Sequence, residues 1–372
     1  MTAPRAITSI PCFMKALVTT GDGHFKMKTT PVPVVETTSV LIKVECAAQN
    51  PTDWKTVALH REAGNIIGCD FSGTVVQIGS DVKAGKRFIG ERVAGCVHGG
   101  IGKNGAFAEY LVASADLVIS LPDSWSFEDG AQLGIATMTT CQCLYQYLSL
   151  PSPLDPSIDD HSTPLLVWSG SSSTGQYVIQ FAKIAGLEIF STSSPRNFSL
   201  LKSLGAKEVF DYSDSKTCKR VFSASRGKLK IAVDCASTGM SPAQVSNSLG
   251  EAGGRIAFLV PAVSMKKHVE TKFILTYTIF GKAIKVPFIH EARPDHYENA
   301  TRYCEMVSKI IMDFPIKPVP VKLYPHGLAS VQEGFDYMKS GKVHAEKLTY
   351  RIPDTPGVQD NLGIDNIQDG PP

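Results

Sequence analysis

The chain has no apolar run long enough to cross a membrane and almost no excess of charge of one sign. Its 372 residues carry a formal net charge of +2 and are 43% hydrophobic, whereas a membrane-spanning helix needs about 20 consecutive apolar residues. Such a balance gives no reason to expect nucleic acid or an anionic membrane as partner. The first residues, MTAPRAITSIPCFMKALV, lack a signal-peptide core with a small-residue cleavage site. We therefore expect a soluble, cytoplasmic protein.

Paired cysteine spacing is also missing. The nine cysteines stand at positions 12, 46, 69, 96, 141, 143, 218, 235 and 304, without a C-x-x-C pair. This spacing argues against a structural zinc site and against a secreted disulfide framework. Cys141 and Cys143 have two interpretations, either a redox or metal-binding pair or two small residues on a buried helix. The second is favoured.

The order of predicted elements divides the chain into two domains. Short β-branched runs separated by Gly, Asp and Pro predict a small barrel or distorted sheet over residues 14–126. A helical pattern follows Ser126, and a proline-rich polar loop covers 151–164. Strands and helices then alternate, which predicts a parallel sheet with helices on both faces. Residues 353–372 carry four Asp and neither Lys nor Arg, and we expect a disordered tail there.

The turn after the first strand of that parallel sheet is poor in glycine. The segment 167–183 reads VWSGSSSTGQYVIQFAK, and only Gly170 and Gly175 remain of the glycines that a dinucleotide-binding turn uses. The N-terminus of the following helix still offers N–H groups to a phosphate, and serine hydroxyls can add donors. Two interpretations stay open: a cofactor turn in which hydroxyls replace glycine, and a serine-rich turn that binds nothing.

The end of the next predicted strand lacks the carboxylate of an NAD site. An acidic residue about 20 residues after the glycine turn ordinarily binds the ribose 2′-hydroxyl. Here residues 193–197 read SSPRN. Hydroxyl, amide and guanidinium groups suit a 2′-phosphate, so the sequence favours NADP(H). The alternative is that this segment only caps the next helix.

Several further motifs, in their order and spacing, resemble the medium-chain dehydrogenase/reductase superfamily. They are NPTD at 50–53, GCDFSGTV at 68–75, GERV at 90–93, GAFAEY at 105–110 and GKVHAEKLTYRI at 341–352. The resemblance covers the chain from Met14 to Ile352. It implies an α/β protein with a GroES-like, β-rich catalytic domain at 14–126, completed by 316–352, and a doubly wound Rossmann domain at 127–315.

Zinc-dependent members of this superfamily carry ligands that the chain lacks. They have a catalytic cysteine near position 50, a His-Glu pair near positions 69 and 70, and four closely spaced cysteines. This chain has Asn50, Cys69 and Asp70 there and no such quartet. Because tetrahedral zinc needs three or four converging nitrogen and sulfur ligands, we expect no bound metal.

Within the superfamily the chain is most similar to fungal stand-alone enoyl reductases that act in trans on polyketide synthases. The proline-rich insert and the runs NPTDWK, SPRN, VFDY, TIFGK and AEKL carry this similarity. It implies an NADPH-dependent reductase of α,β-unsaturated thioesters on the acyl carrier domain of a polyketide (or polyketide–nonribosomal peptide) synthase, as a monomer or homodimer. The alternatives are a reductase of free quinones or enones, and a non-redox cyclase or accessory subunit.

The resemblance also implies roles for individual residues. Thr52, Asp53, Trp54 and Lys55 would lie at the nicotinamide, Ser171, Ser172, Ser173 and Thr174 at the diphosphate, and Ser194, Pro195, Arg196, Asn197 and Tyr212 at the 2′-phosphate. Leu259 and Val260 would flank the nicotinamide ribose, and His344 and Ala345 would cover the cofactor. The acyl tunnel would be lined by Thr137, Met138, Thr139, Thr140, Cys141, Leu144, Thr278, Ile279, Phe280, Gly281 and Lys282. Lys55 and Thr137 are the catalytic candidates, with plain structural roles as the alternative.

Lysines are concentrated in one segment near the implied tunnel. Residues 264–290 hold five Lys and one Glu around the apolar run TYTIFGK. Acyl carrier domains are generally acidic, so a basic rim around an apolar entrance would attract one. We expect Lys266 and Lys267 to contribute to this docking. An ordinary solvated face is the alternative.

Overall fold

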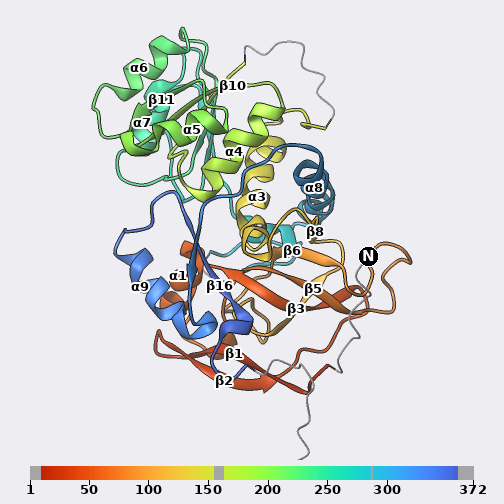
Figure 1. The fold of residues 1–372 in the computed structure, drawn as a ribbon. Coiled ribbons are helices and arrows are strands. Elements are labelled where there is room, and N and C mark those ends of the chain that lie inside the picture. Colours follow the sequence, from red (N-terminus) through yellow and green to blue (C-terminus); the bar gives the residue numbers. More distant parts are fainter. Residues whose placement is uncertain (1–9, 155–162, 286–287, 359–372) are drawn as a thin grey trace, which may run out of the picture.

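The chain folds into two parts that lie one above the other in Figure 1. The computed structural model describes residues 10–154, 163–285 and 288–358. The lower part holds two sheets, and the upper part holds one parallel sheet. The segment with α9 (Val331–Lys339) and β16 (Lys347–Arg351), blue in Figure 1, returns from the upper part to the lower one.

The lower part is built mainly from antiparallel strands. A small sheet has the order β2-β1-β4, with β1 Phe13–Thr20, β2 Phe25–Pro31 and β4 Ala63–Ile66. A seven-stranded sheet has the order β15-β16-β3-β5-β6-β8, with β7 paired to β3. Its other strands are β3 Ser39–Ala48, β5 Asp70–Ile78, β6 Arg92–Cys96, β7 Tyr110–Ser114, β8 Val118–Ser120 and β15 Val321–Tyr324. Alternate residues of β3, such as Val40, Ile42 and Val44, share one core with Phe71 and Phe107.

The upper part is a six-stranded sheet in which every neighbouring pair is parallel. The order is β11-β10-β9-β12-β13-β14, with β9 Pro164–Trp168, β10 Glu188–Ser193, β11 Glu208–Asp211, β12 Ile231–Asp234, β13 Gly254–Phe258 and β14 Val269–Phe273. All five residues of β9 are buried, as in a strand covered on both faces. Chain order reverses between β9 and β12, and ligands bind beyond the carboxyl ends at such a point.

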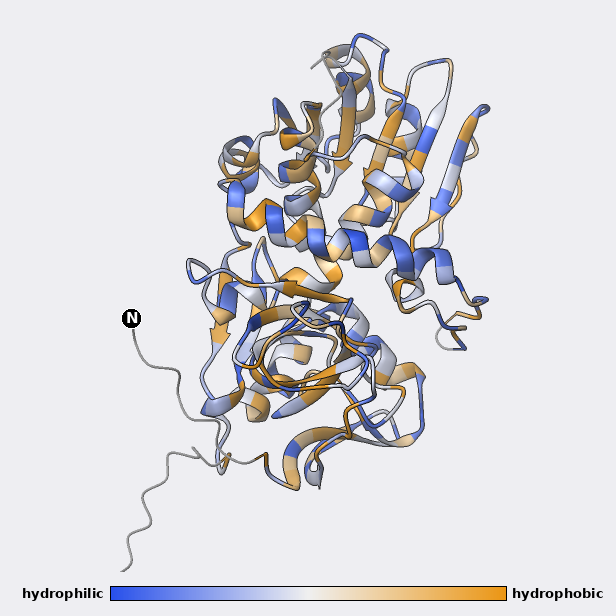
Figure 2. Cartoon of the chain, turned by 90° about the vertical axis from the view of Figure 1, so that its right-hand side faces the viewer, coloured by the Kyte–Doolittle hydropathy of each residue, from blue (hydrophilic) through white to orange (hydrophobic). Residues whose placement is uncertain are grey.

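Helices surround the parallel sheet and connect the two parts. In Figure 2 they carry both hydrophilic and hydrophobic residues, whereas strands of the upper sheet show hydrophobic runs. The helices are α4 Ser173–Ile184, α5 Phe198–Leu204, α6 Thr217–Ala224, α7 Ser241–Ser248 and α8 Pro294–Asp313, with 3-10 turns η2 Pro195–Asn197 and η3 Thr276–Phe280. The helix predicted after Ser126 is divided into α2 Phe127–Gly130, α3 Leu133–Cys141 and the π-helical turn η1 Gln142–Tyr147.

The lower part contributes one helix of direct interest, α1 Pro51–Leu59. It begins immediately after β3 because Pro51 fits the first helical turn and Asp53 caps it: the Asp53 carboxylate accepts the N–H of Asn50 at 2.6 Å. This capping turns Asp53 inward, and only 2% of its surface is exposed. Shorter 3-10 turns, η4 Gly327–Ser330 and η5 Ile352–Asp354, flank α9 and β16.

Two segments differ from the sequence analysis. Residues 269–273, which belong to the segment expected to form a basic rim, form the edge strand β14. Residues 353–358, expected in a disordered tail, include the end of η5 and the buried Thr355, whose hydroxyl accepts the N–H of Leu328 at 2.8 Å. The hydrogen bond of this buried hydroxyl fixes residues 353–358, and amino-acid composition alone does not predict such a contact. The rest of the expected tail, 359–372, lies outside the described residues.

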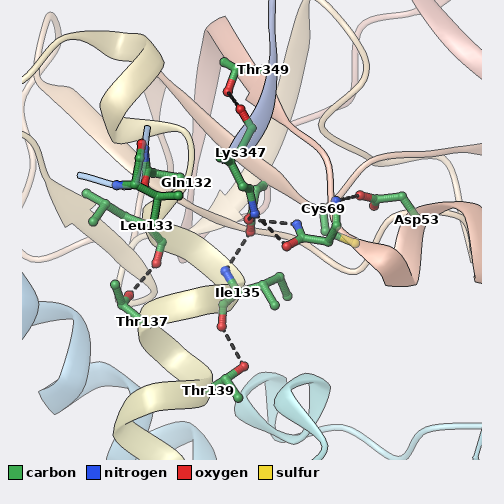
Figure 3. A network of polar contacts seen from close by, with 12 residues as sticks. Asp53, Cys69, Gln132, Leu133, Ile135, Thr137, Thr139, Lys347 and Thr349 are labelled. Atoms are coloured by element: carbon green, nitrogen blue, oxygen red, sulfur yellow. Dashed lines mark hydrogen bonds and ion pairs between the residues drawn. The ribbon is translucent and has the colours of Figure 1, made fainter. Parts of the chain in front are cut away.

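A buried ion pair ties the returning segment to the seven-stranded sheet (Figure 3). Lys347 Nζ lies 2.9 Å from Asp70 Oδ2 and 2.7 Å from Asn50 Oδ1. Asn50 Nδ2 donates to Asp70 Oδ2 at 2.8 Å, and the backbone N–H of Ile135 donates to Asp70 Oδ1 at 2.7 Å. The side chains of Lys347 and Asp70 are 3% and 0% exposed. One carboxylate therefore joins β5, the start of α1, α3 and β16.

Lys347→Met should lower the free energy of unfolding by about 3–5 kcal/mol at neutral pH, because it leaves a buried charge without its partner. Burial raises the pKa of Asp70, and Lys347 opposes that shift, so without the lysine the pKa rises further. A carboxyl whose pKa is higher in the folded state stabilises less as the pH rises. The deficit should therefore shrink in acid. Urea unfolding followed by circular dichroism at several pH values measures both effects.

The double variant Lys347→Met/Asp70→Asn is the matched control. It removes both charges and keeps the shape of the carboxyl side chain, so it should recover most of the lost stability. A double variant as unstable as Lys347→Met, at every pH, would contradict a stabilising ion pair.

Candidate active site

A cavity of about 750 Å³ lies between the two parts, at the carboxyl ends of the parallel strands. Its wall is formed by the turns after β9, β10, β11, β12 and β13, by α1, by α3 and by the segment that precedes β16. A second hollow of about 980 Å³ lies at the opposite, amino edge of the sheet, next to the starts of β10 and β11. Only the first lies where a doubly wound sheet binds its ligand, and it is the candidate site.

The serine-rich turn forms the N-terminus of α4 and faces this cavity. Ser172 caps the helix: its hydroxyl accepts the N–H of Gly175 at 3.1 Å and donates to the carbonyl of Ser169 at 2.9 Å. The N–H groups of Ser173 and Thr174 lie in the first turn and have no acceptor within the helix. The four residues Ser171, Ser172, Ser173 and Thr174 all line the cavity. Backbone and hydroxyl donors therefore converge at a positive helix end, which fits a bound diphosphate.

The two glycines left in this turn serve packing. A Cβ on Gly170 would lie 2.1 Å from Ser191 Oγ, and a Cβ on Gly175 would lie 2.7 Å from the carbonyl oxygen of Ser169. Ser169 itself has a φ of 59°, in the left-handed region that a non-glycine residue rarely adopts. Glycine is thus kept where the strand and helix meet, and serine occupies the side that faces the cavity.

The ends of β10 and β11 carry neutral polar groups into the cavity. Ser194, Asn197 and Tyr212 line it, and Tyr212 is 50% exposed. Pro195 and Arg196 belong to the same 3-10 turn but are exposed and do not line the wall. Among the described residues that line this end, none is acidic. The charge is thus compatible with a 2′-phosphate, with Arg196 at the rim.

A carboxylate at the end of β12 holds the next stretch of wall, and the sequence analysis missed it. Asp234 accepts the N–H of Ser237 at 2.8 Å and the hydroxyl of Ser241 at 2.7 Å. Ser237, with a φ of 51°, accepts the N–H of Leu259 at 2.8 Å. Burial raises the pKa of Asp234, while these hydrogen bonds lower it. Leu259 and Val260, which line the cavity, are therefore fixed from β12.

Of the four α1 residues expected at the nicotinamide, two reach the cavity. Thr52 and Lys55 line it, and the exposed Lys55 has its Nζ 5.7 Å from the centroid of the Trp54 ring. Trp54 is half-buried against the core of the lower part, and Asp53 is buried inside the helix cap. A helix presents only part of its circumference to one cavity. Thr52 and Lys55 lie on the side of α1 that faces the cavity, and Asp53 and Trp54 do not.

The returning segment contributes to the wall of the cavity. His344 and Ala345 both line it. Ala345 has a φ of 55°, and its carbonyl accepts the Nε2 of Gln176 on α4 at 3.4 Å. This contact connects the segment before β16 to the helix that begins at the serine turn.

The expected tunnel residues on α3 are mostly in the core, and Thr137 is wrong as a catalytic candidate. Thr137 is fully buried, and its hydroxyl donates to the carbonyl of Leu133 one turn earlier. Thr139, which was also expected in the tunnel, lines the cavity together with Ile135, which lies four residues earlier and so on the same face. The other expected residues, Met138, Thr140, Cys141 and Leu144, are buried. Cys143 is buried as well, and both it and Cys141 are free thiols.

The tunnel residues expected after position 277 also point elsewhere. Thr278 is 3% exposed and binds His296 Nδ1 at 2.7 Å, and Ile279 packs in the core. Phe280, Gly281 and Lys282 do not line the cavity either. The wall is formed by the preceding residues 273–277, since the tight 3-10 turn η3 rotates its later residues away. Thr276 Oγ1 lies 2.5 Å from Thr139 Oγ1.

The lysines expected to dock a carrier lie at the opposite edge of the sheet. Lys266 and Lys267 precede β14, which runs parallel to β13, so they lie at the amino edge. Lys266 Nζ donates to the carbonyl of Leu249 at 2.6 Å. Lys282 and Lys285 follow β14, are exposed, and belong to the same loop as Phe288, which lines the cavity.

At the positions that the sequence analysis compared with zinc ligands, the chain makes other contacts. Asn50 and Asp70 bind the ammonium of Lys347, and the Cys69 thiol lies 3.3 Å from the Tyr277 hydroxyl. Within residues 10–154, 163–285 and 288–358, no cluster of three or more His, Cys, Asp or Glu could hold a metal ion. No helix in those ranges is long and apolar enough to cross a membrane.

Similarity to curated proteins extends over nearly the whole chain. Residues 36–123 match the alcohol dehydrogenase GroES-like domain. A trans-enoyl reductase of Alternaria alternata is 36% identical over 343 residues, which cover 91% of this chain and 98% of that protein. A trans-enoyl reductase of Aspergillus niger is 35% identical over 366 residues, 94% of this chain and 100% of that protein.

Solved structures share the architecture at low identity. The quinone oxidoreductase from Coxiella burnetii has a TM-score of 0.66 at 24% identity, and the match covers 91% of this chain and 99% of the oxidoreductase chain. The CurK enoyl reductase has a TM-score of 0.72 at 16% identity, with 90% and 98% covered. A mycobacterial protein solved with NADPH has a TM-score of 0.70 at 22% identity, with 90% and 99% covered. The predicted fold class is confirmed, and the chain belongs to the family of trans-enoyl reductases.

Proposed function

We propose that the chain is an NADPH-dependent enoyl reductase that acts in trans on α,β-unsaturated thioesters, which the acyl carrier domain of a polyketide synthase (or of a polyketide–nonribosomal peptide synthase) presents. One observation carries the proposal. The donors of the serine turn, the wall residues after β10 and β11, none of which is acidic, and the side chains of Lys55 and Thr139 all line one cavity. The family of the chain supports an oxidoreductase with a nicotinamide cofactor.

The residues on the wall fit such a cofactor. The first turn of α4 and the hydroxyls of 171–174 would hold the diphosphate. Ser194, Asn197 and Tyr212, with Arg196 from the rim, would hold the 2′-phosphate. Leu259 and Val260 would contact the nicotinamide ribose, and His344 and Ala345 would cover it. A nicotinamide bound there would supply the hydride.

Reduction of an enoyl thioester places negative charge on the thioester oxygen, so donors aimed at that oxygen lower the barrier. Lys55 brings an ammonium group to the wall. Thr139 takes the place first considered for Thr137. Its hydroxyl donates to the carbonyl of Ile135 at 2.6 Å and lies 2.5 Å from the hydroxyl of Thr276, which fixes its position at the wall. Lys55 is therefore the proposed donor to the developing enolate, and Thr139 would add a second hydrogen bond only by turning its proton from Ile135 to the substrate.

Purified protein should oxidise NADPH in the presence of an enoyl thioester on an acyl carrier domain, with a higher kcat/KM than for free enones or quinones. Loss of nicotinamide absorbance and mass spectrometry of the reduced acyl chain measure this. Faster turnover of free quinones would favour the small-molecule reductase instead. Absence of nicotinamide fluorescence enhancement on mixing with NADPH would favour the non-redox alternative.

Arg196→Ala should weaken NADPH binding about tenfold or more and leave NADH binding unchanged, because a charge-assisted phosphate contact contributes roughly 1.5–3 kcal/mol. Fluorescence titration with both cofactors measures the two affinities. Lys202→Ala, an exposed cation on α5 beside the second hollow, is the matched control and should change neither. Equal affinity of the unmodified protein for NADPH and NADH would contradict the 2′-phosphate site.

Lys282→Glu/Lys285→Glu should lower kcat/KM for carrier-bound substrate several-fold and leave a small free thioester unaffected, since exposed charges act on an acidic partner and are screened within about 8–10 Å. Lys230→Glu/Lys267→Glu makes the same charge change at the amino edge of the sheet and should alter neither substrate. Steady-state rates at low and high salt measure the difference. An equal response of both substrates would rule out carrier docking at this loop.

A further inference from the structure

A line of side chains with transferable protons runs from the cavity wall into the interior beside α1. Thr52 Oγ1, at the wall, lies 2.6 Å from the hydroxyl of Tyr277, and that hydroxyl lies 3.3 Å from the Sγ of Cys69. The Cys69 thiol in turn contacts the carboxyl group of Asp53, and Figure 3 shows these two residues next to each other. Hydroxyl, phenol, thiol and carboxyl thus follow one another inward.

The line meets the cavity at its outer end, where Thr52 and Tyr277 both belong to the wall. Asp53, Cys69 and Tyr277 are 2%, 1% and 4% exposed, whereas Thr52 is partly exposed at the wall. The ring of His98 stacks on the ring of Tyr277 with a centroid distance of 3.7 Å. Burial lowers the pKa of His98 to about 4, so this ring is neutral at neutral pH. The stack fixes the phenol without placing a charge beside it.

The inner end can store a proton. Asp53 Oδ2 accepts the N–H of Asn50, while Oδ1 is buried without a hydrogen bond of regular geometry to a described residue. A buried carboxylate oxygen of that kind favours protonation, and burial raises the pKa of Asp53 to about 7. The titratable and charged groups that face Asp53 are Cys69, Asp70, Tyr277, Lys347 and Tyr350. Among these, the hydrogen bond with Cys69 and the charge of Lys347 oppose the rise of the pKa, and the charge of Asp70 supports it.

We propose that this line delivers the proton that the α-carbon of the substrate takes after hydride addition, with Thr52 as the catalytic donor and Tyr277, Cys69 and Asp53 as its relay. The inference rests on the proposed enoyl reduction. The electron pair of the enolate forms a bond to the proton of the Thr52 hydroxyl. The oxygen of Thr52 takes the proton of Tyr277, Tyr277 takes that of Cys69, and Cys69 takes that of Asp53, which is left as a carboxylate.

The relay is reset by the reverse path. Once the product leaves, water in the cavity can give a proton to Thr52, and the shifts along Tyr277 and Cys69 return one to Asp53. One proton is consumed in each cycle, and the protein gains or loses no electrons. Because the Thr52 hydroxyl is held by Tyr277, it delivers to one face of the enolate, whereas protonation by free water would reach both faces.

Tyr277→Phe breaks the line and keeps the ring that stacks on His98. With a free α-methyl enoyl thioester and NADPH, the unmodified protein should give one α-epimer, and Tyr277→Phe should give both. Its kcat should fall by about 10²-fold, the low end of the usual contribution of general acid catalysis. Thr52→Val should have the same two effects. Chiral chromatography gives the epimer ratio, and fluorescence titration should show unchanged NADPH affinity in Tyr277→Phe, which separates this effect from a cofactor defect.

Asp53→Asn tests the inner end separately. The amide oxygen can still accept the N–H of Asn50, but the side chain holds no acidic proton. In the unmodified protein kcat should fall as the pH rises through about 7, because Asp53 then loses its proton. Asp53→Asn should have a lower kcat, little dependence on pH in this range, and still one epimer, since Thr52 and Tyr277 remain.

Tyr110→Phe is the matched control, because it removes a phenol that is buried elsewhere, in the lower part. It should leave rate and epimer ratio unchanged. A single epimer at full rate from both Tyr277→Phe and Thr52→Val, with folding verified by circular dichroism, would overturn the relay. A mixture of epimers from the unmodified protein would overturn it too. An unmodified protein that reduces no enoyl thioester would overturn the proposed function, and this inference with it.

Discussion

The buried carboxylate of Asp70 fixes three parts of the cavity wall at once. It binds Lys347, which follows the segment of His344 and Ala345, and it binds Asn50, which precedes Thr52 and Lys55 on α1. It also accepts the N–H of Ile135, which lies one turn before Thr139 on α3. Segments almost 300 residues apart in the chain thus meet on two oxygen atoms. Because both charges are buried, the ion pair of Lys347 and Asp70 stabilises the fold only in a well-defined geometry. The same geometry fixes the three parts of the cavity wall.

The sequence predicted the parts of the fold that depend on local patterns. The apolar run of β9, the turn at 170–175 and the capped start of α4 follow from periodicity and turn chemistry. The rotation of α3 could not be predicted in the same way. Eight of its nine residues are buried, so it has no polar face that would orient it. Whether Thr137 or Thr139 reaches the cavity is decided by packing against both parts of the protein, and the sequence analysis selected as catalytic the one that lies away from the cavity.

Position along a parallel sheet explains the other main error. The strand β14 reads VETKF, with alternating half-buried and exposed residues, and such an edge strand has too little apolar content to be recognised. Without that strand, residues 264–290 looked like one continuous basic rim. With it, the segment is divided: Lys267 lies at the amino edge and Lys285 beyond the carboxyl edge, where the cavity is. Tyr277 was missed for the same reason, since its place at the wall depends on where β14 ends.

Asp53 combines two roles that oppose each other electrostatically. A carboxylate at a helix N-terminus is stabilised by the helix dipole and by the N–H groups it accepts, which lowers its pKa. Asp53 accepts such an N–H from Asn50, yet its burial outweighs this, and the negative charge of Asp70 nearby acts in the same direction as burial. The short run 50–55 therefore begins α1, supplies Thr52 and Lys55 to the wall, and keeps behind them a carboxyl group that titrates near neutral pH. A capping residue exposed to water would start the helix equally well, but it would hold no proton at that pH.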